Sequence, residues 1–175
     1  MKIGFDLDGV VVNYAKGLKD YHHTLIKEDD PLTYSMIEPG WFTSKQDWLN
    51  THIRAMEHCD TFEIEDETVQ EAVQRLKAAG HTVIAATARN SCHRDKTLAQ
   101  LENNGIYFDE LIMTGHAIPK SEIGLDWLLE DHPDTVCERS RTQMVIKDHA
   151  YNREVPENIP RVTTCLEYAD LILNS

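Results

Sequence analysis

The feature that most constrains the fold is an alternation of short apolar segments with segments of helical periodicity. The apolar segments are typical of strands buried on both faces of a sheet; they are Ile3–Leu7 with its continuation Val10–Val12, Thr82–Thr87, Glu110–Thr114, Trp127–Glu130 and Met144–Ile146. The helical patterns between and after them are Thr68–Ala79, Ser91–Asn104, Pro133 to about Arg141, and Leu166–Leu173. This order predicts an α/β fold with a doubly wound parallel sheet, covered on both faces.

Residues 13–67 interrupt this alternation directly after the first strand. Apolar and aromatic residues recur there at helical spacing in two stretches, Tyr14 to Leu25 and Ser44–His58. In the second stretch, the residues expected to point inward are Trp48, Leu49, Ile53 and Met56. We therefore predict a small helical insert over residues 13–67, set within a core domain formed by residues 1–12 and 68–175.

The composition narrows the classes of partner. The chain has 175 residues and a formal net charge of −13, which makes a nucleic acid polymer unexpected as the main partner because such proteins usually carry a basic surface. There is no run of about 18 apolar residues and no basic-then-apolar leader, so we expect neither membrane insertion nor secretion. The four cysteines are scattered, which argues against a zinc site or disulfide frame and fits the reducing cytoplasm. A homodimer remains open.

Polar side chains follow the carboxyl ends of several predicted strands. They are Asp6 with Asp8, Thr87, and Glu130 with Asp131. Because the carboxyl ends of parallel strands meet at one edge of a sheet, we expect these groups to line one crevice. Two carboxylates spaced two residues apart on a strand point the same way and repel each other unless a cation lies between them.

Carboxylates without clustered cysteine or histidine suit a hard cation with oxygen ligands, and we expect Mg²⁺. The hydroxyl of Thr87 and the ammonium of Lys120 would complete a phosphate pocket. One carboxylate could attack phosphorus to form an aspartyl-phosphate, and a second could protonate the leaving alcohol and later deprotonate water. The alternatives are a calcium loop at Asp6, a solvated turn at Asp131, and Lys147 as the phosphate contact in place of Lys120.

Four ordered motifs resemble those of the haloacid dehalogenase superfamily of phosphohydrolases. D-L-D-G-V, at residues 6–10, is similar to the first motif, I-A-A-T-A-R with Thr87 to the second, Lys120 to the third and W-L-L-E-D-H-P to the fourth. The insert lies where that superfamily carries a small helical cap. The tail, I-K-D-H-A-Y-N-R followed by R-V-T-T-C-L-E, further resembles the 5′(3′)-deoxyribonucleotidase branch and its bacterial relatives. The chain departs from that branch at two places. It has Cys165 in the last segment, where that branch often has a tryptophan, and its fourth motif reads E-D where that branch has D-D.

This resemblance implies a role for each matched residue. Asp6 would be the nucleophile, and Asp8 the general acid and base, ligating Mg²⁺ through its backbone carbonyl. Asp131 would be the third protein ligand of Mg²⁺, with Glu130 behind the ligands. The residues implied to hold the phosphoryl oxygens are Thr87, Ala88 and Lys120.

The resemblance also implies a substrate, namely a small phosphate ester and in particular a (deoxy)nucleoside monophosphate. Three aromatic residues of the insert could stack on a base or form the core of the cap; they are Tyr34, Trp41 and Phe42. The alternatives are a phosphatase for sugar phosphates or nucleic acid 3′ ends, and a silent Mg²⁺- or nucleotide-binding module. Arg89, His149 and Asn152 lie near the motifs, and the sequence leaves their roles undecided.

Overall fold

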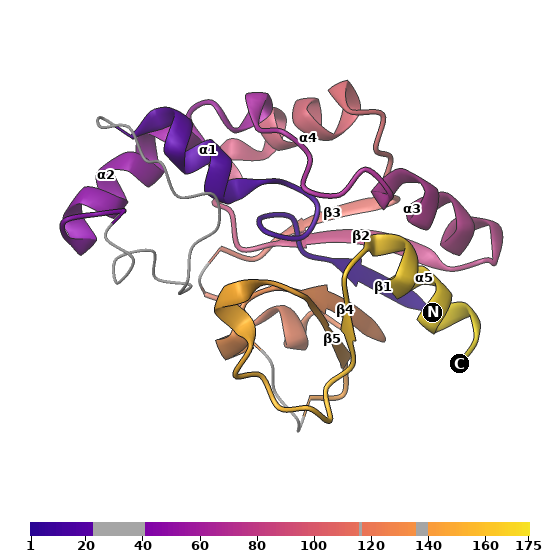
Figure 1. The fold of residues 1–175 in the computed structure, drawn as a ribbon. Helices are drawn as coiled ribbons and strands as arrows, with labels where there is room; N and C mark the ends of the chain where they lie inside the picture. The colour runs from indigo at the N-terminus through magenta and orange to yellow at the C-terminus, as the bar shows by residue number, and fades with distance from the viewer. Residues whose placement is uncertain (23–40, 116, 136–139) are drawn as a thin grey trace.

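The structure, a computed structural model, describes residues 1–22, 41–115, 117–135 and 140–175. Within them a single six-stranded sheet has the order β3-β2-β1-β4-β5-β6, and every neighbouring pair is parallel (Figure 1). The strands are β1 (Lys2–Phe5), β2 (Thr82–Thr87), β3 (Glu110–Met113), β4 (Trp127–Glu130), β5 (Gln143–Lys147) and β6 (Arg161–Val162). The predicted parallel sheet is confirmed. The pattern missed β6, which is only two residues long.

The helices lie close to their predicted positions. They are α1 (Tyr14–Tyr21), α2 (Lys45–Met56), α3 (Val69–Ala78), α4 (Arg94–Asn103) and α5 (Cys165–Leu173). The helix predicted from Pro133 to about Arg141 lies partly outside the described residues. Its start forms the 3-10 turn η4 (Pro133–Thr135), residues 136–139 lie outside the described ranges, and residues 140–142 are not helical.

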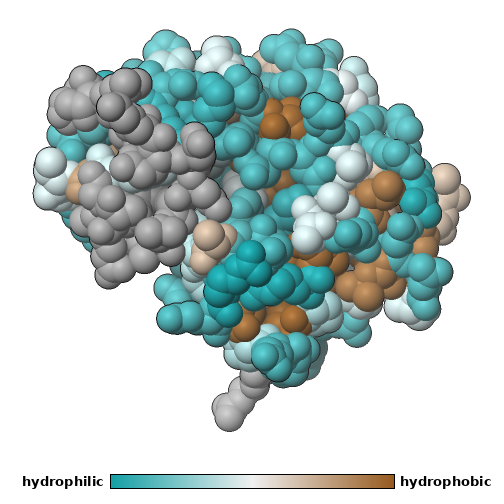
Figure 2. Space-filling model, in the orientation of Figure 1, coloured by the Kyte–Doolittle hydropathy of each residue, from teal (hydrophilic) through white to brown (hydrophobic). Residues whose placement is uncertain are grey.

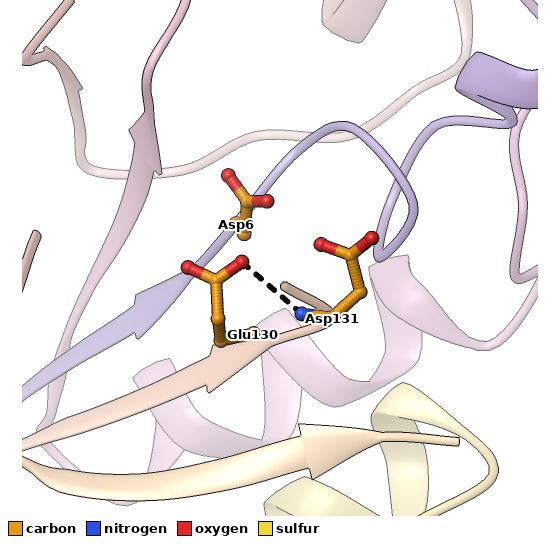
Figure 3. Close-up of side chains that lie close together, drawn as sticks. All are labelled: Asp6, Glu130 and Asp131. Atoms are coloured by element: carbon orange, nitrogen blue, oxygen red, sulfur yellow. Dashed lines mark hydrogen bonds between the residues drawn. The ribbon is translucent and has the colours of Figure 1, made fainter. Parts of the chain in front are cut away.

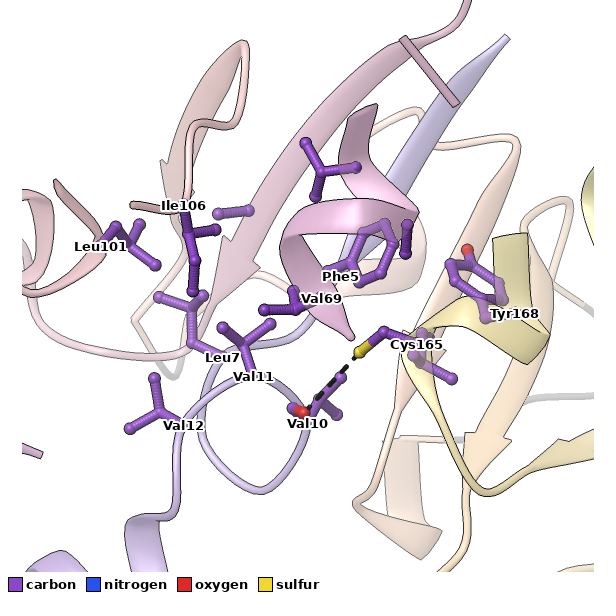
Figure 4. Packing of buried hydrophobic residues seen from close by; sticks show 14 of the residues in the cluster. Phe5, Leu7, Val10, Val11, Val12, Val69, Leu101, Ile106, Cys165 and Tyr168 are labelled. Atoms are coloured by element: carbon purple, nitrogen blue, oxygen red, sulfur yellow. Dashed lines mark hydrogen bonds between the residues drawn. The ribbon is translucent and has the colours of Figure 1, made fainter. Parts of the chain in front are cut away.

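Alternate strand residues face two apolar clusters, one on each side of the sheet. On the larger side, α3 and α5 pack against each other and over the strands. The ring of Phe5 on β1 meets that of Tyr168 on α5 edge-on, with centroids 5.0 Å apart (Figure 4). On the other side, a Cβ atom at Gly4 would lie 2.4 Å from Cδ1 of Leu125. The close packing there explains why position 4 carries no side chain.

The chain leaves β1 through a tight loop, so the predicted strand at Val10–Val12 is wrong. The backbone amides of the three valines all donate to the carbonyl of Leu7, over 3.2, 2.9 and 2.8 Å. Gly9 turns the chain with φ at 85°, a conformation that glycine adopts readily. The three valines are nevertheless fully buried (Figure 4). Their apolar pattern therefore comes from a packed loop and not from a strand.

Within the insert, α1 and α2 pack against each other (Figure 1). Ser44 caps α2, because its hydroxyl accepts from the backbone amide of Asp47 over 3.1 Å. The predicted inward face of α2 is partly wrong: Leu49 and Ile53 are exposed, whereas Met56 is buried. Trp48 is half-buried and packs against the large hydrophobic cluster, and the buried residues of α2 are Thr51, Ala55 and Met56. The division into a core domain and a cap remains a prediction.

The visible surface is largely hydrophilic, with apolar residues in separate areas (Figure 2). Among the helices in the described ranges, none is both long and apolar enough to cross a lipid bilayer.

Candidate active site

The candidate site lies where the order of the strands reverses. β1 pairs with β2 on one side and with β4 on the other, so the loops after β1 and β4 leave the sheet side by side. Asp6 directly follows β1, and its backbone amide donates to the carbonyl of Leu129 on β4 over 2.9 Å. Glu130 ends β4 and Asp131 follows it. This switch point is the usual ligand-binding position of a doubly wound sheet.

Three carboxylates meet at this point (Figure 3). Asp6, Glu130 and Asp131 each offer an oxygen, and these oxygens all lie within 4.8 Å of one another. The three residues are only 5%, 0% and 3% exposed. Glu130 is fixed through one oxygen, Oε1, which accepts from the backbone amides of Asp131 and His132 over 3.1 Å each. Such a buried group of like charges requires positive charge nearby.

Lys120, in the 3-10 turn η3 (Lys120–Glu122), supplies part of that charge. Its Nζ lies 2.8 Å from Oδ1 of Asp6 and 2.6 Å from Oε2 of Glu130. Burial would lower the pKa of this ammonium, but Asp6 and Glu130 raise it above its ordinary value, so Lys120 is charged at neutral pH. One ammonium among three carboxylates still leaves two negative charges when all three are ionised.

The carboxyl pKa values show how the three groups share this charge. Burial, followed by the charge of Glu130, raises the pKa of Asp6 to about 7, against the opposing effect of Lys120. Burial, Glu130 and Asp6 raise the pKa of Asp131 well above its ordinary value. Burial also disfavours the charged form of Glu130, yet Lys120, the backbone amide of His132 and a side-chain hydrogen bond with Asp131 hold its pKa below its ordinary value. The cluster therefore lacks positive charge.

Asp131 is held by the 3-10 turn η5 (Ala150–Asn152), which follows β5. The hydroxyl of Tyr151 donates to Oδ2 of Asp131 over 2.5 Å, and the side-chain amide of Asn152 donates to the backbone carbonyl of Asp131 over 2.9 Å. Gly9 approaches the same carboxylate: a Cβ atom there would lie 2.3 Å from Oδ2 of Asp131 and 3.0 Å from the hydroxyl of Tyr151. The ring of His149 stacks on Tyr151 and bonds to the carbonyl of Gly9 over 2.6 Å.

Asp8 is not part of the acidic cluster. The guanidinium of Arg89 binds both of its carboxylate oxygens, over 2.9 and 2.6 Å. Thr87, at the end of β2, is buried, and its hydroxyl oxygen accepts from the backbone amide of Arg89 over 3.2 Å. Ala88 follows it and is half-buried. The segment after β2 thus contacts the loop after β1 through the ion pair of Arg89 with Asp8.

The structure also distinguishes the two candidate lysines. Nζ of Lys147 lies 2.6 Å from Oδ2 of Asp66 and 2.7 Å from the carbonyl of Thr163, so it serves a separate buried ion pair. Only Lys120 contacts the carboxylate of Asp6 among the lysines of the described ranges. This arrangement favours Lys120 as the phosphate contact.

The predicted aromatic pocket is less well supported. Trp41 and Phe42 are 3% and 2% exposed and belong to the large hydrophobic cluster, which favours a packing role over substrate contact. Tyr34 lies outside the described residues.

The donor set of the acidic cluster fits a divalent cation. It consists of oxygen atoms alone, which suits Mg²⁺ better than a softer metal. When all three carboxylates are ionised, the two negative charges that Lys120 does not compensate match the charge of such an ion. Asp6, Glu130 and Asp131 are the side chains that would hold it. Glu130, which the resemblance implied to lie behind the ligands, is thus also placed to be a ligand itself.

The model of one protein family matches residues 33–143, more than half of the chain; that family is described as "Protein of unknown function (DUF2608)". The chain belongs to this family. The segment matched by the family model includes Lys120, Glu130 and Asp131 and begins after Asp6 and Asp8. No curated protein matches the chain.

Solved structures of hydrolases have the same fold as this family member. A proposed phosphoglycolate phosphatase from Lactobacillus delbrueckii subsp. bulgaricus is 11% identical, with a TM-score of 0.67 over 99% of this chain and 98% of that one. A HAD-superfamily hydrolase of subfamily IA from Geobacter sulfurreducens is 15% identical, with a TM-score of 0.61 over 98% and 95%. A haloacid dehalogenase-like hydrolase from Xanthomonas campestris is 15% identical, with a TM-score of 0.57 over 99% and 95%. At these identities the likeness shows the α/β fold.

Sequence reasoning did not assign the residues that orient the site. Tyr151 lies in the quoted K-D-H-A-Y-N segment, but nothing local indicated that its hydroxyl would reach Asp131, 20 positions away. Arg89 is the last residue of the I-A-A-T-A-R segment, but that segment gave it no role, and its partner Asp8 is 81 positions away. The one available signal was proximity to motif residues in the sequence.

Proposed function

We propose that this chain is a Mg²⁺-dependent phosphohydrolase that cleaves small phosphate monoesters through an aspartyl-phosphate on Asp6. The observation that carries the proposal is the buried acidic cluster at the switch point, with Lys120 bridging Asp6 and Glu130. A bound divalent cation would supply the missing positive charge and neutralise the oxygens of the substrate phosphate. It would also favour the ionised form of Asp6, which a nucleophile requires.

In the first step, a carboxylate oxygen of Asp6 forms a bond to phosphorus while the bond from phosphorus to the ester oxygen breaks. Asp8 gives its proton to the departing alkoxide, so the product is a neutral alcohol. In the second step, water attacks the phosphorus of the aspartyl-phosphate and gives a proton to Asp8. Inorganic phosphate leaves, and both aspartates return to their starting states. Lys120 and the segment at Thr87 and Ala88 hold the phosphoryl oxygens through these steps.

The proposed substrate is a (deoxy)nucleoside monophosphate, processed in the cytoplasm. The net charge of −13 supports a small substrate over a polymer, because an acidic protein repels a long phosphate backbone. The proposed cap over residues 13–67 would close over a substrate of that size and exclude water.

Two variants and one chelator test the chemistry. Asp6→Asn removes turnover of an aryl phosphate, because an amide is a poor nucleophile. Asp8→Asn slows turnover by roughly 10²–10⁴-fold, the range expected for lost acid and base help. EDTA abolishes turnover and added Mg²⁺ restores it. Near-normal turnover by Asp6→Asn, or unchanged activity in EDTA, would contradict the mechanism, and Mg²⁺ binding without turnover of any ester would indicate the silent binding module.

A phosphate-release screen tests the substrate class. We expect a higher kcat/KM for nucleoside monophosphates than for sugar phosphates or a 3′-phosphorylated oligonucleotide. All substrates are compared at one fixed low salt concentration, because salt alone changes nucleic acid affinity. A clear preference for the oligonucleotide or for a sugar phosphate would overturn the nucleotidase assignment and leave the phosphatase chemistry standing.

A further inference from the structure

Asp8 is oriented by a neighbour that no motif assigned. Arg89 grips both of its carboxylate oxygens: Nε donates to Oδ2 over 2.9 Å and Nη2 donates to Oδ1 over 2.6 Å. A guanidinium that binds a carboxylate through two parallel hydrogen bonds fixes its plane as well as its position. The carboxylate of Asp8 remains 22% exposed, while the side chain of Arg89 is 2% exposed.

Arg89 is itself anchored on the side away from Asp8. Its Nη1 donates to the hydroxyl of Thr97 over 3.1 Å and to Oε1 of Gln100 over 2.9 Å. These two buried residues are three positions apart on α4 and therefore share one face of the helix. Gln100 is oriented in turn, because its amide donates to the carbonyl of Phe62 over 3.0 Å. The guanidinium is thus a rigid connection between α4 and Asp8.

This rigidity matters because Asp8 has a competing position. It lies two residues after Asp6, in the loop that leads from the acidic cluster, and a bound divalent cation would attract a further carboxylate. If Asp8 turned toward that cation, its oxygens would no longer be available to the ester oxygen of the substrate. A general acid must hold the leaving atom within hydrogen-bond reach. Each carboxylate oxygen has a second lone pair that Arg89 leaves unused.

We propose that Arg89 is a positioning residue that holds Asp8 out of the cation site and on the leaving-group side of the substrate. The proposal rests on the function proposed above. Arg89 touches neither substrate nor cation in this role. It acts only through the orientation of the Asp8 carboxylate, and α4 supplies the support for that orientation.

The first test is the dependence of kcat/KM on the leaving group. The substrates are para-nitrophenyl phosphate, which has an acidic leaving group, and phenyl phosphate, which has nearly the same size and a less acidic one. Without an aligned acid, Arg89→Met loses about 10²-fold in kcat/KM for phenyl phosphate and less than about tenfold for para-nitrophenyl phosphate. Arg89→Lys keeps the buried charge but cannot grip both oxygens, so it shifts the ratio in the same direction by a smaller factor.

The control is Lys147→Met, which removes a cation of similar burial from a separate ion pair. It lowers stability as Arg89→Met does, but it leaves the ratio of the two substrates unchanged. If an Arg89 variant slows both substrates by the same factor, Arg89 is only a structural residue and the proposal is wrong. Gln100→Leu retains the guanidinium and removes one anchor, so it provides the measurement if Arg89→Met does not fold.

The second test needs no turnover. Isothermal titration calorimetry measures the Kd for Mg²⁺ in wild type, Arg89→Met and Arg89→Lys. An Asp8 carboxylate released toward the cation tightens binding, by about tenfold for the Met variant. Because Arg89→Lys preserves the charge, tighter binding in that variant also separates released Asp8 from the simple loss of a positive charge. An unchanged Kd in both variants overturns the proposal. If the variants bind Mg²⁺ more tightly as expected but the wild-type protein hydrolyses no ester, only the proposed function is contradicted.

Discussion

Asp66→Asn should lower the stability of the protein more than the substitution of any exposed charged residue, because Asp66 joins three parts of the chain. Its Oδ2 lies 2.6 Å from Nζ of Lys147 on β5 and accepts from the backbone amide of Cys165 at the start of α5 over 2.5 Å. Its Oδ1 accepts from the backbone amide and the hydroxyl of Thr68, at the start of α3, over 2.9 and 2.6 Å. An amide at this position keeps the shape but leaves the Lys147 ammonium buried without a counter-charge.

The magnitude follows from the burial of this ion pair. The side chains of Lys147 and Asp66 are only 6% and 5% exposed, and breaking a buried pair by removing one partner costs about 3–5 kcal/mol. For a chain of this size, that loss lowers Tm by about 6–20 °C. Urea denaturation followed by circular dichroism measures the free energy of unfolding directly.

The pH dependence of the same variant provides a second measurement. Burial disfavours the charged form of Asp66, but hydrogen bonds from Lys147 and Thr68 lower its pKa from 3.8 to about 2. A depressed carboxyl pKa stabilises the folded state above the unfolded value, near 4, and this contribution is lost as pH falls through about 2. The stability difference between wild type and Asp66→Asn therefore narrows by about 2 kcal/mol between pH 5 and pH 2.

The control is Asp170→Asn, which breaks an exposed ion pair with Arg75. Their atoms are 2.6 Å apart, but the side chains are 45% and 42% exposed, so we expect a change within about 0.5 kcal/mol. The reasoning is refuted if Asp66→Asn lowers the free energy of unfolding by less than about 1 kcal/mol, which is close to the change expected for the control. It is also refuted if the loss of stability relative to wild type is the same at pH 5 and pH 2.

Three further predictions concern the site. Lys120→Met should lower kcat by about 10²–10³-fold, since it removes one proposed donor to the phosphoryl oxygens, and it should lower Tm, since it leaves Asp6 and Glu130 buried without their counter-charge; kinetics and a melting curve test the two parts. Tyr151→Phe should weaken Mg²⁺ binding by about 10–100-fold in calorimetry, because the hydroxyl that orients Asp131 is lost. Gly9→Ala should abolish turnover and cost more stability than Gly80→Ala: both positions have positive φ, but a Cβ at Gly9 would clash with Asp131, whereas nothing lies within 4 Å of one at Gly80. Equal losses in the two glycine variants would contradict the clash.

The sequence predicted most of the elements, because strand and helix patterns are local and need only a few consecutive residues. It failed at Val10–Val12, where three buried valines in a row look the same in a packed loop as in a strand. The motif residues Asp6 and Asp131 could be placed at one edge of the sheet from the parallel topology alone. The bonds of Arg89 to Asp8 and of Tyr151 to Asp131 could not, because they depend on side-chain directions in loops that have no repeating geometry.

The central place of β1 in the sheet has a consequence for synthesis on the ribosome. β1 is translated before the other strands of the sheet, yet one of its neighbours, β4, is completed only at residue 130. At the usual 5–20 residues per second, Asp6 waits roughly 6–25 s for Asp131 to be made. In that interval β1 has at first no partner strand and, after residue 87, only β2, so its other edge offers unpaired backbone groups to any neighbouring chain. A nascent chain that stops before β4 is therefore an aggregation hazard that contains Asp6, the proposed nucleophile, but neither of the other two carboxylates of the acidic cluster.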